Sequence, residues 1–583
     1  MPASGPELQA TFTPLGGPLM RIQISSCRAL FAAGLLILSG SLAQASPPHA
    51  GSFNCDKPSG ILCAEQRENP GGNEYYVGHD EPAVLFYSNE PGAGSNNVYR
   101  LRLPKDPPLL PKQDGSGGTW NFQLRPAFWF GMAMCDDQGD PNPGGSPSAG
   151  PNIPCAAASD SNIFDSPDPA APDYIGRHPG TAFMEMQFYP PGWLFALFGQ
   201  GTATQWTAAL NIDSFQDNAN TGQTNNPACS AITNDEYVNF AFIQTDGVPF
   251  PAGSPSPLGP VVRTNANTLR MNPGDELIVT LADTEHGLKI TVQDLTTGQT
   301  GFMVASGANG FASVRWDPTG NNCNFATHNL QHDFHPAYAT SSEHTRVPGA
   351  AHSYNIAFSD EIGHFEYCSS VAEEFGACTS LKGKDKKPGL DDVVCVDSGF
   401  LAAFGLIPIG GCIDTDADFD GVTYRKNTWP GSSKDPVQDA LFHTEPVMFS
   451  SPLFTDGKGH MENFSRVAFE VDMPRIEFGT TPPCQRHLSN PADKHPGHGC
   501  VNPPKGAAFY PFFSTRLDSH GCRWQLGGPF IPGTLDDFGG NSAAEFGDIL
   551  ALFYPAANAQ PQFIYEDFRQ ILPINPCPTF TDG

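Results

Sequence analysis

Two short segments place carboxyl and amide side chains at alternate positions. Residues 181–188 read TAFMEMQF, so an extended strand puts Glu185 and Gln187 on one face, and Asn211 and Asp213 alternate in the same way within LNID. Acids and amides on one sheet surface can bind sugar hydroxyls or catalyse hydrolysis by general acid and base. Glu185 and Asp213 are therefore candidate catalytic residues. Gln187 and Asn211 are candidate substrate-binding residues, and the alternative is an ordinary hydrated sheet face.

A second candidate site is an aspartate-rich segment. Four acids alternate and are followed by a glycine, at Asp414, Asp416, Asp418 and Asp420. Oxygen ligands at alternate positions before a sharp glycine turn match the opening of a calcium loop. Counted from Asp416, position twelve is Asn427 and not the bidentate Glu of an EF-hand. The segment is either a calcium loop completed by other ligands or a solvated acidic turn.

Histidines beside acids suggest a further metal site. His332, His335 and His364 offer nitrogen donors that could share a zinc or copper ion, or they are hydrogen-bonded surface groups. The histidines between Cys484 and Cys500 also resemble a zinc cluster. A disulfide between these two cysteines is the simpler interpretation in an exported chain.

The start of the chain predicts export. Arg21 and Arg28 precede an apolar run at 29–42 that is too short to span a bilayer, and an Ala-Gln-Ala cleavage sequence follows. We expect 1–45 to be a signal peptide and the mature protein to begin near Ser46, secreted or periplasmic. No later segment reaches the roughly 18 apolar residues of a membrane helix, so we expect no membrane insertion.

The cysteines predict a disulfide framework. Of 15 cysteines, Cys27 lies within the signal peptide, which leaves an even number in an oxidising compartment. Sequence spacing favours the pairs Cys55–Cys63, Cys135–Cys155, Cys229–Cys323, Cys368–Cys378, Cys395–Cys412, Cys484–Cys500 and Cys522–Cys577.

Charge and missing motifs exclude several classes of function. The chain has 31 basic and 61 acidic residues, a net charge of −30. Nucleic acids and anionic membranes repel such a protein, so we expect neither as a partner. The chain also lacks a G-x-S-x-G elbow, an H-E-x-x-H sequence, a phosphate loop and a dinucleotide fingerprint.

The elements that must position these residues are strands. The chain has 61 Gly and 57 Pro, which punctuate strands and break helices. The clearest segment is 272–305, where a Pro-Gly turn leads into two runs that alternate apolar and polar residues around Gly287. This pattern predicts an antiparallel meander within an all-β sandwich.

The same meander carries a family resemblance. The turn NPGD, the alternating runs and the turn DLTTGQ resemble the central meander of the glutamic peptidases. The resemblance implies a concanavalin-like β-sandwich, in a family whose members activate water with a Gln and a Glu. The candidates on TAFMEMQF have these side-chain types, but 306–316, where the family's Glu is expected, contains no acid. The resemblance therefore implies a fold and assigns no catalytic residue.

Composition shifts suggest a domain organisation. We expect an N-terminal disulfide-bearing segment at 46–80 and a large concanavalin-like or jelly-roll sandwich at 81–378. A lysine-rich linker at 379–390 would join it to a smaller, loop-heavy β-rich domain at 391–583.

Together these patterns predict a secreted, disulfide-stabilised, all-β protein. The favoured function is binding or hydrolysis of an extracellular polymer, with carbohydrate first, on a concave sheet face. One alternative is an acid peptidase of the glutamic type. The other is a non-catalytic surface or structural protein stabilised by calcium and disulfides.

Overall fold

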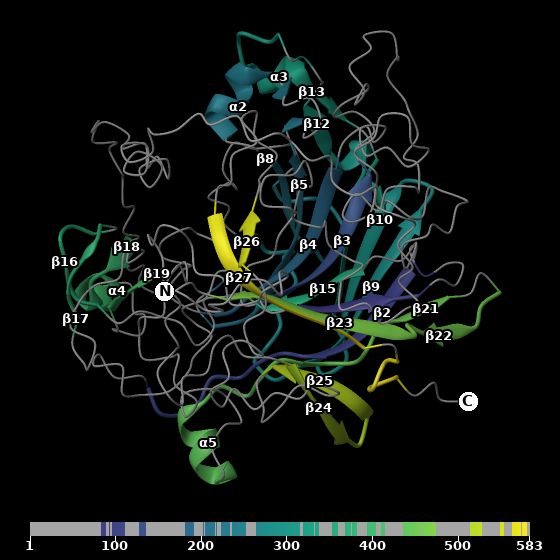
Figure 1. The fold of residues 1–583 in the computed structure, drawn as a ribbon, viewed down its shortest axis with the longest axis vertical. Coiled ribbons are helices and arrows are strands. Elements are labelled where there is room, and N and C mark those ends of the chain that lie inside the picture. The colour runs from purple at the N-terminus through teal and green to yellow at the C-terminus, as the bar shows by residue number, and fades with distance from the viewer. Residues whose placement is uncertain are drawn as a thin grey trace, which may run out of the picture. The chain divides into compact units, whose positions relative to one another are not determined.

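A computed structural model gives the fold of the chain (Figure 1). The residues that it describes are 83–88, 93, 96–110, 128–135, 181–191, 202, 204–215, 217–218, 223–224, 226–233, 236–251, 264–314, 317, 319–331, 333–336, 353–358, 368–374, 376–381, 393–403, 410–413, 435–455, 458–473, 513–526, 549–552, 563–572 and 574–579. The predicted signal peptide and the segment 46–80 lie outside these residues.

The first sheet has ten antiparallel strands among the described residues. Its order is β26-β27-β23-β1-β15-β3-β4-β5-β8, and β14 pairs with the end of β3. The bounds are β1 Ala83–Tyr87, β3 Phe128–Cys135, β4 Thr181–Tyr189, β5 Thr207–Phe215, β8 Glu236–Phe242, β14 His335–Pro336, β15 Ser353–Phe358, β23 Arg466–Met473, β26 Ile549–Leu552 and β27 Phe563–Leu572.

The second sheet is also antiparallel. Its order is β11-β10-β9-β2-β20-β25-β24, with β21 paired to β2 and β22 paired to β21. The bounds are β2 Asn96–Arg102, β9 Glu276–Thr284, β10 Gly287–Asp294, β11 Thr300–Val304, β20 Met448–Phe449, β21 Leu453–Thr455, β22 Met461–Asn463, β24 Phe513–Asp518 and β25 Gly521–Leu526.

Short elements accompany the two sheets. Two-stranded pairs are formed by β6 Asp217–Asn218 with β7 Gln223–Thr224, β12 Ala312–Val314 with β13 Asn329–Gln331, β16 Cys368–Val371 with β17 Cys378–Leu381, and β18 Val393–Val396 with β19 Gly411–Ile413. The helices are α2 Pro227–Thr233, η4 Gly307–Asn309, α3 Phe325–His328, α4 Ser398–Ala403 and α5 Pro436–Phe442. Within the described residues, no helix is long and apolar enough to cross a membrane.

The predicted meander is confirmed as strands β9, β10 and β11. Leu277, Val279 and Leu281 on β9 are fully buried, whereas the residues between them are partly exposed. Gly274 has a φ of +87°, the left-handed conformation that glycine adopts without steric cost, so the Pro-Gly turn forms where the sequence places it. The alternation of apolar residues therefore decides which face of this sheet is buried.

The two sheets pack face to face through one aromatic core. Tyr99 of β2 stacks on Phe130 of β3 with ring centroids 4.2 Å apart. Trp524 of β25 lies edge-on to Phe86 of β1, at 6.3 Å. These rings belong to a single cluster of buried side chains that includes residues of both sheets. The described strands thus form the β-sandwich architecture that the composition predicted.

Strands from both sides of the predicted linker share the two sheets. In the first sheet, β23 pairs with β1 through Ala83 and Glu470. In the second sheet, β20 pairs with β2 through Leu101 and Phe449. The described strands therefore do not separate into two sandwiches at 379–390, because strands of the predicted second domain complete the sheets of the first.

Disulfide bonds cross-link this sandwich. The predicted pairs Cys229–Cys323 and Cys522–Cys577 are confirmed, with Cα atoms 4.7 and 5.3 Å apart. Cys378 and Cys395 are also disulfide-bonded. Their predicted partners are Cys368 and Cys412, whose side chains lie outside the described part of the structure.

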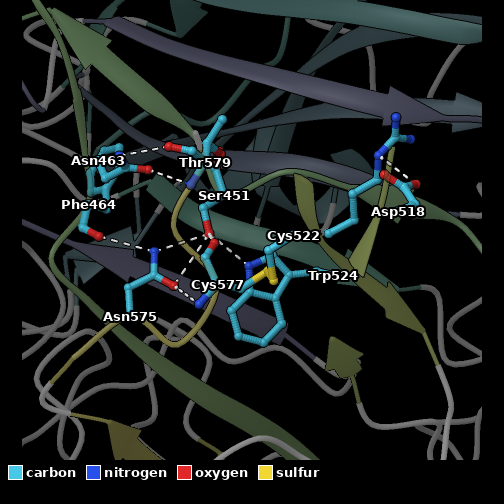
Figure 2. The surroundings of a disulfide bond; sticks show 10 residues. Ser451, Asn463, Phe464, Asp518, Cys522, Trp524, Asn575, Cys577 and Thr579 are labelled. Atoms are coloured by element: carbon cyan, nitrogen blue, oxygen red, sulfur yellow. Dashed lines mark hydrogen bonds and ion pairs between the residues drawn. A yellow bond between two sulfur atoms is a disulfide. The ribbon is translucent and has the colours of Figure 1, made fainter. Parts of the chain in front are cut away.

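A polar network anchors the C-terminal segment beside Cys522–Cys577, as Figure 2 shows. Ser451 Oγ accepts hydrogen bonds from Trp524 Nε1 at 2.8 Å and from Asn575 Nδ2 at 3.1 Å, and it donates to the Cys577 carbonyl at 2.7 Å. All four residues are buried. Each of these contacts joins residues far apart in sequence, so the network forms only when the sandwich closes.

Candidate functional site

The four residues predicted to carry chemistry lie on strands β4 and β5. Met184, Met186 and Phe188 of β4 are fully buried in the core between the sheets. Because side chains alternate along a strand, Glu185 and Gln187 belong to the opposite face, which we call the outer face of the first sheet. Figure 1 shows β3, β4, β5 and β8 as neighbouring strands of this sheet.

The strand register places the acid Glu185 close to the amides Gln187 and Asn211. Glu185 lies directly opposite Asn211 of β5, and Gln187 lies opposite Ala209. On the other side of β4, Gln187 lies opposite Trp129 of β3. Directly opposite residues in an antiparallel pair have Cβ atoms about 4.5–5.5 Å apart, so their side chains interact.

A chain of hydrogen bonds runs along the outer face of β4. The hydroxyl of Tyr189 donates to Oε1 of Gln187, and Nε2 of Gln187 donates to Oε2 of Glu185 at 2.5 Å. Tyr189 and Gln187 are buried, with 5% and 8% of their surface exposed, whereas Glu185 is half-buried. The amide is thus held in one orientation by its two partners, and the chain of hydrogen bonds ends at the half-buried carboxylate.

Asn211 and Asp213 follow on β5. Asn211 is 7% exposed and lies across from Glu185. Asp213 is paired with Phe183 on β4 and Val238 on β8, two positions along from Asn211 on the same face. The side chain of Asp213 lies outside the described part of the structure. The register therefore places all four predicted residues on one sheet face.

An aromatic cluster lies beside Glu185, Gln187 and Asn211. The sequence patterns did not reveal it. Tyr189 lies 6.3 Å from Phe240 and 6.4 Å from Phe242, ring centre to ring centre, and Ala209 completes the cluster. The signal in the sequence is the alternation of Phe240 and Phe242 on β8, which assigns them to a shared face. The side chains of this cluster are buried, so the outer face beside Gln187 is apolar and covered.

Trp129 lies on the other side of that amide. It is 4% exposed, and its buried indole Nε1 has no hydrogen-bond partner among the described residues. Its strand is apolar on both faces, so the sequence predicts a covered strand and gives no sign that one N–H is left unpaired. A buried donor with no acceptor is costly and rare, which marks this position as unusual.

The surrounding strands carry no positive charge. The sequences of β15, β3, β4, β5 and β8 contain no Lys, Arg or His, while Glu185, Asp213 and Glu236 supply acids. These strands therefore offer no cation that could pair with an anionic ligand.

The predicted histidine site is only partly described. His335 Nδ1 lies 2.7 Å from Oδ1 of Asp283 on β9, and both side chains are mostly buried. His332 and His364 lie outside the described residues. In the part of the chain that the structure describes, no group of three or more His, Cys, Asp or Glu side chains is arranged to hold a metal ion.

The aspartates at 414–420 lie outside the described residues, so the calcium loop stays a prediction.

No family model, curated protein or solved structure matches this chain. Its function is therefore argued from the chemistry of the outer face.

Proposed function

We propose that this protein is exported and binds or hydrolyses an extracellular carbohydrate polymer on the outer face of the first sheet. The observation that carries the proposal is the hydrogen-bonded chain Tyr189, Gln187 and Glu185, which ends in a half-buried carboxylate opposite Asn211. Oriented carboxylate and amide groups are the usual partners of sugar hydroxyls, because they offer acceptors and donors side by side.

The same arrangement supports hydrolysis. Glycoside hydrolysis requires two carboxyl groups, one as general acid and one as base or nucleophile. Glu185 is one of these carboxyl groups, since Gln187 donates to it and fixes its orientation. Asp213, two positions beyond the residue opposite Glu185, is the second. Binding alone needs only the first carboxylate with the neighbouring amides.

Export is supported by the disulfides. Cys229–Cys323 and Cys522–Cys577 join segments 94 and 55 residues apart. Disulfides of this kind form and persist outside the reducing cytosol. The predicted signal peptide at 1–45 provides the route.

The decisive experiment compares Glu185→Gln with the wild type on a panel of polysaccharides. We would measure reducing-end release, and also pull-down by insoluble cellulose, chitin, xylan and starch. Glu285→Gln is the matched control, because Glu285 is exposed in the turn between β9 and β10. Loss of binding or hydrolysis in Glu185→Gln alone supports the proposal. If the wild type, Glu185→Gln and Glu285→Gln behave equally on every polymer, the proposal is wrong.

A second candidate is an acid peptidase of the glutamic type. It is favoured by the direct hydrogen bond from Gln187 to Glu185, which pairs the two side-chain types that this class uses. Such an enzyme would digest unfolded protein at acid pH, would be unaffected by metal chelators and would lose activity in Glu185→Gln. Absence of both activities and of polysaccharide binding would leave the non-catalytic, structural alternative.

A further inference from the structure

The second sheet has an outer face of its own. Leu277, Val279 and Leu281 of β9 are buried in the core, so the residues between them belong to the opposite side, which we call the outer face of the second sheet. Figure 1 shows β9 and β10 side by side, and β2 and β11 lie next to them in the same sheet. The outer-face residues of these four strands are partly or fully exposed, so a ligand can reach them.

A row of two hydroxyl groups and one aromatic ring crosses this face. Thr280 of β9 lies directly opposite Thr291 of β10, which lies opposite Phe302 of β11. Side chains directly opposite each other share one side of a sheet, so these three form a continuous row. Among the described residues, neither threonine hydroxyl has a hydrogen-bond partner. Both hydroxyls are therefore available to donate to a ligand and to accept from it.

Two cations lie on either side of this row. Arg100 of β2 lies opposite the residue two positions before Thr280. Lys289 lies two positions before Thr291 on the antiparallel strand β10, which places it on the other side of the row. Alternate residues of a strand are about 7 Å apart, so the row runs between two positive charges. Lys289 Nζ lies 4.9 Å from the ring centre of Phe302, and neither cation has an acidic partner among the described residues.

The acids of these four strands do not neutralise the two cations. Glu276 pairs with the buried guanidinium of Arg523 at 3.1 Å, and Asp283 lies 2.7 Å from His335. Asp294 is 1% exposed, and its carboxylate accepts two backbone N–H groups of its own turn. This face therefore presents unneutralised positive charge, although the whole chain has a net charge of −30.

The groups on this face select an anionic sugar polymer. Guanidinium and ammonium groups form their strongest hydrogen bonds with carboxylates, which neutral sugars lack. Hydroxyl groups suit the hydroxyls of a sugar, and the ring of Phe302 offers an apolar surface for the face of a sugar ring. An acidic peptide would also bring carboxylates, but it would leave the row of threonine hydroxyls with few partners.

We propose that the outer face of the second sheet, around Arg100 and Lys289, is a second carbohydrate-binding surface that takes polymers of uronic acids. This surface belongs to a different sheet from Glu185, so it can fail or hold independently of the function proposed for the first sheet. It would hold the protein on an acidic polysaccharide while the first sheet acts on its own ligand.

The test is the double variant Arg100→Gln, Lys289→Gln, with affinity for a galacturonate hexamer measured by calorimetry. We expect affinity to fall tenfold or more, because two charge-assisted contacts are lost. The affinity of the wild type should also fall as sodium chloride is raised, because salt screens exposed charges. The melting temperature should stay the same, since neither cation has an acidic partner among the described residues.

The matched control is Lys458→Gln, Arg516→Gln, which removes the same charge at two exposed positions. It should bind the hexamer like the wild type. Equal losses in the two double variants would overturn the site, because attraction would then depend only on total charge. Arg100→Lys keeps the charge and should retain most of the affinity, which separates the loss of charge from a packing defect.

Other ligands test the class of polymer. Equal affinity for neutral cello and laminari hexamers would overturn the role of the cations, and equal affinity for hexaglutamate would identify an acidic protein as the partner instead. If the wild type binds no galacturonate hexamer, the inference is wrong. Glu185→Gln should bind the hexamer like the wild type, so its effect on other polysaccharides decides the proposed function separately.

Discussion

Gln187 donates a hydrogen bond of 2.5 Å from its side-chain amide to the carboxylate of Glu185, two residues away on the same strand. The other end of that amide accepts from Tyr189. Because Gln187 is buried, its two bonds replace hydrogen bonds to water and fix the amide. The orientation of the candidate carboxylate thus depends on a buried tyrosine.

Replacing Gln187 by leucine should destabilise the protein. The buried hydroxyl of Tyr189 loses its acceptor, so we expect the free energy of unfolding to fall by about 1–3 kcal/mol. Urea denaturation measures this value. The control is Tyr189→Phe combined with Gln187→Leu, since removing both partners should cost less than the sum of the single changes. Strict additivity would show that the two side chains are not coupled.

Asp275→Asn should flatten the dependence of stability on pH. Burial raises the pKa of Asp275 above its ordinary value of 3.8, and the hydrogen bond and charge of Asp294 raise it further, against lowering by hydrogen bonds from Asn272. The unfolded chain therefore ionises first as pH rises above about 4, and the folded state loses stability until Asp275 itself ionises. Among the described residues, Lys105 lies near this turn, and Glu276 follows it and pairs with Arg523.

Melting temperature against pH, for wild type and Asp275→Asn, checks this expectation. The asparagine can still accept from the Asn272 backbone and can donate to Asp294, so the variant should retain its stability above pH 4 better than the wild type. Glu285→Gln, an exposed change in the next turn of the meander, should leave the wild-type profile unchanged. Parallel profiles for wild type and Asp275→Asn would contradict the raised pKa.

Loss of the two partners of Arg523 should destabilise the protein more than replacement of Arg523 itself. Its side chain is 1% exposed and pairs with Glu276 at 3.1 Å and Asp518 at 3.3 Å, both of which are partly exposed. The double variant Glu276→Gln, Asp518→Asn leaves a buried charge unpaired, which costs about 3–5 kcal/mol. Arg523→Met removes that charge and should cost less. Denaturant unfolding that ranks the two variants in the opposite order would show that the buried charge does not need its partners.

Ser451→Ala should loosen the C-terminal segment. The variant removes the acceptor that Trp524 and Asn575 share, although Asn575 Nδ2 still donates to the Phe464 carbonyl, so we expect a cost of about 1–3 kcal/mol. We expect a lower melting temperature and faster reduction of Cys522–Cys577, measured by thiol alkylation under mild reductant. Ser519→Ala, in the exposed turn between β24 and β25, is the control and should behave like the wild type.

Calcium removal tests the aspartate loop directly. A ligand that binds only the folded state raises its stability by about 2.7 kcal/mol at one hundred times the dissociation constant. We therefore expect a chelator to lower the melting temperature of the wild type and to have no effect on Asp416→Asn, Asp418→Asn. An identical melting temperature with calcium and with chelator would identify the segment as a solvated acidic turn.

Part of the site follows directly from the sequence. Alternation in TAFMEMQF assigns Glu185 and Gln187 to one face, because successive side chains of any strand point to opposite sides. The Pro-Gly turn at Gly274 is equally local, since it depends on the backbone freedom of one residue. Distant cysteine pairs such as Cys229–Cys323 could be predicted because few partners remained once close neighbours were paired.

Other parts of the site depend on which strands lie side by side. Alternation along one strand does not identify its neighbours. Strand order placed Trp129 beside Gln187, and it gathered Phe240 and Phe242 around Tyr189. Nothing in the local sequence of β3 or β8 specifies which strand lies next to it.

By itself, the sequence determined the period of the strands, the positions of the turns, the acidic charge and the wealth of cysteines. These properties belong to single residues or to neighbours along the chain. Only the tertiary structure decided that β23 and β20, from beyond the predicted linker, complete the two sheets, and that Trp129 lies opposite Gln187. The reason is physical: strand pairing and burial bring together residues far apart in sequence, and their free energy depends on every neighbour at once.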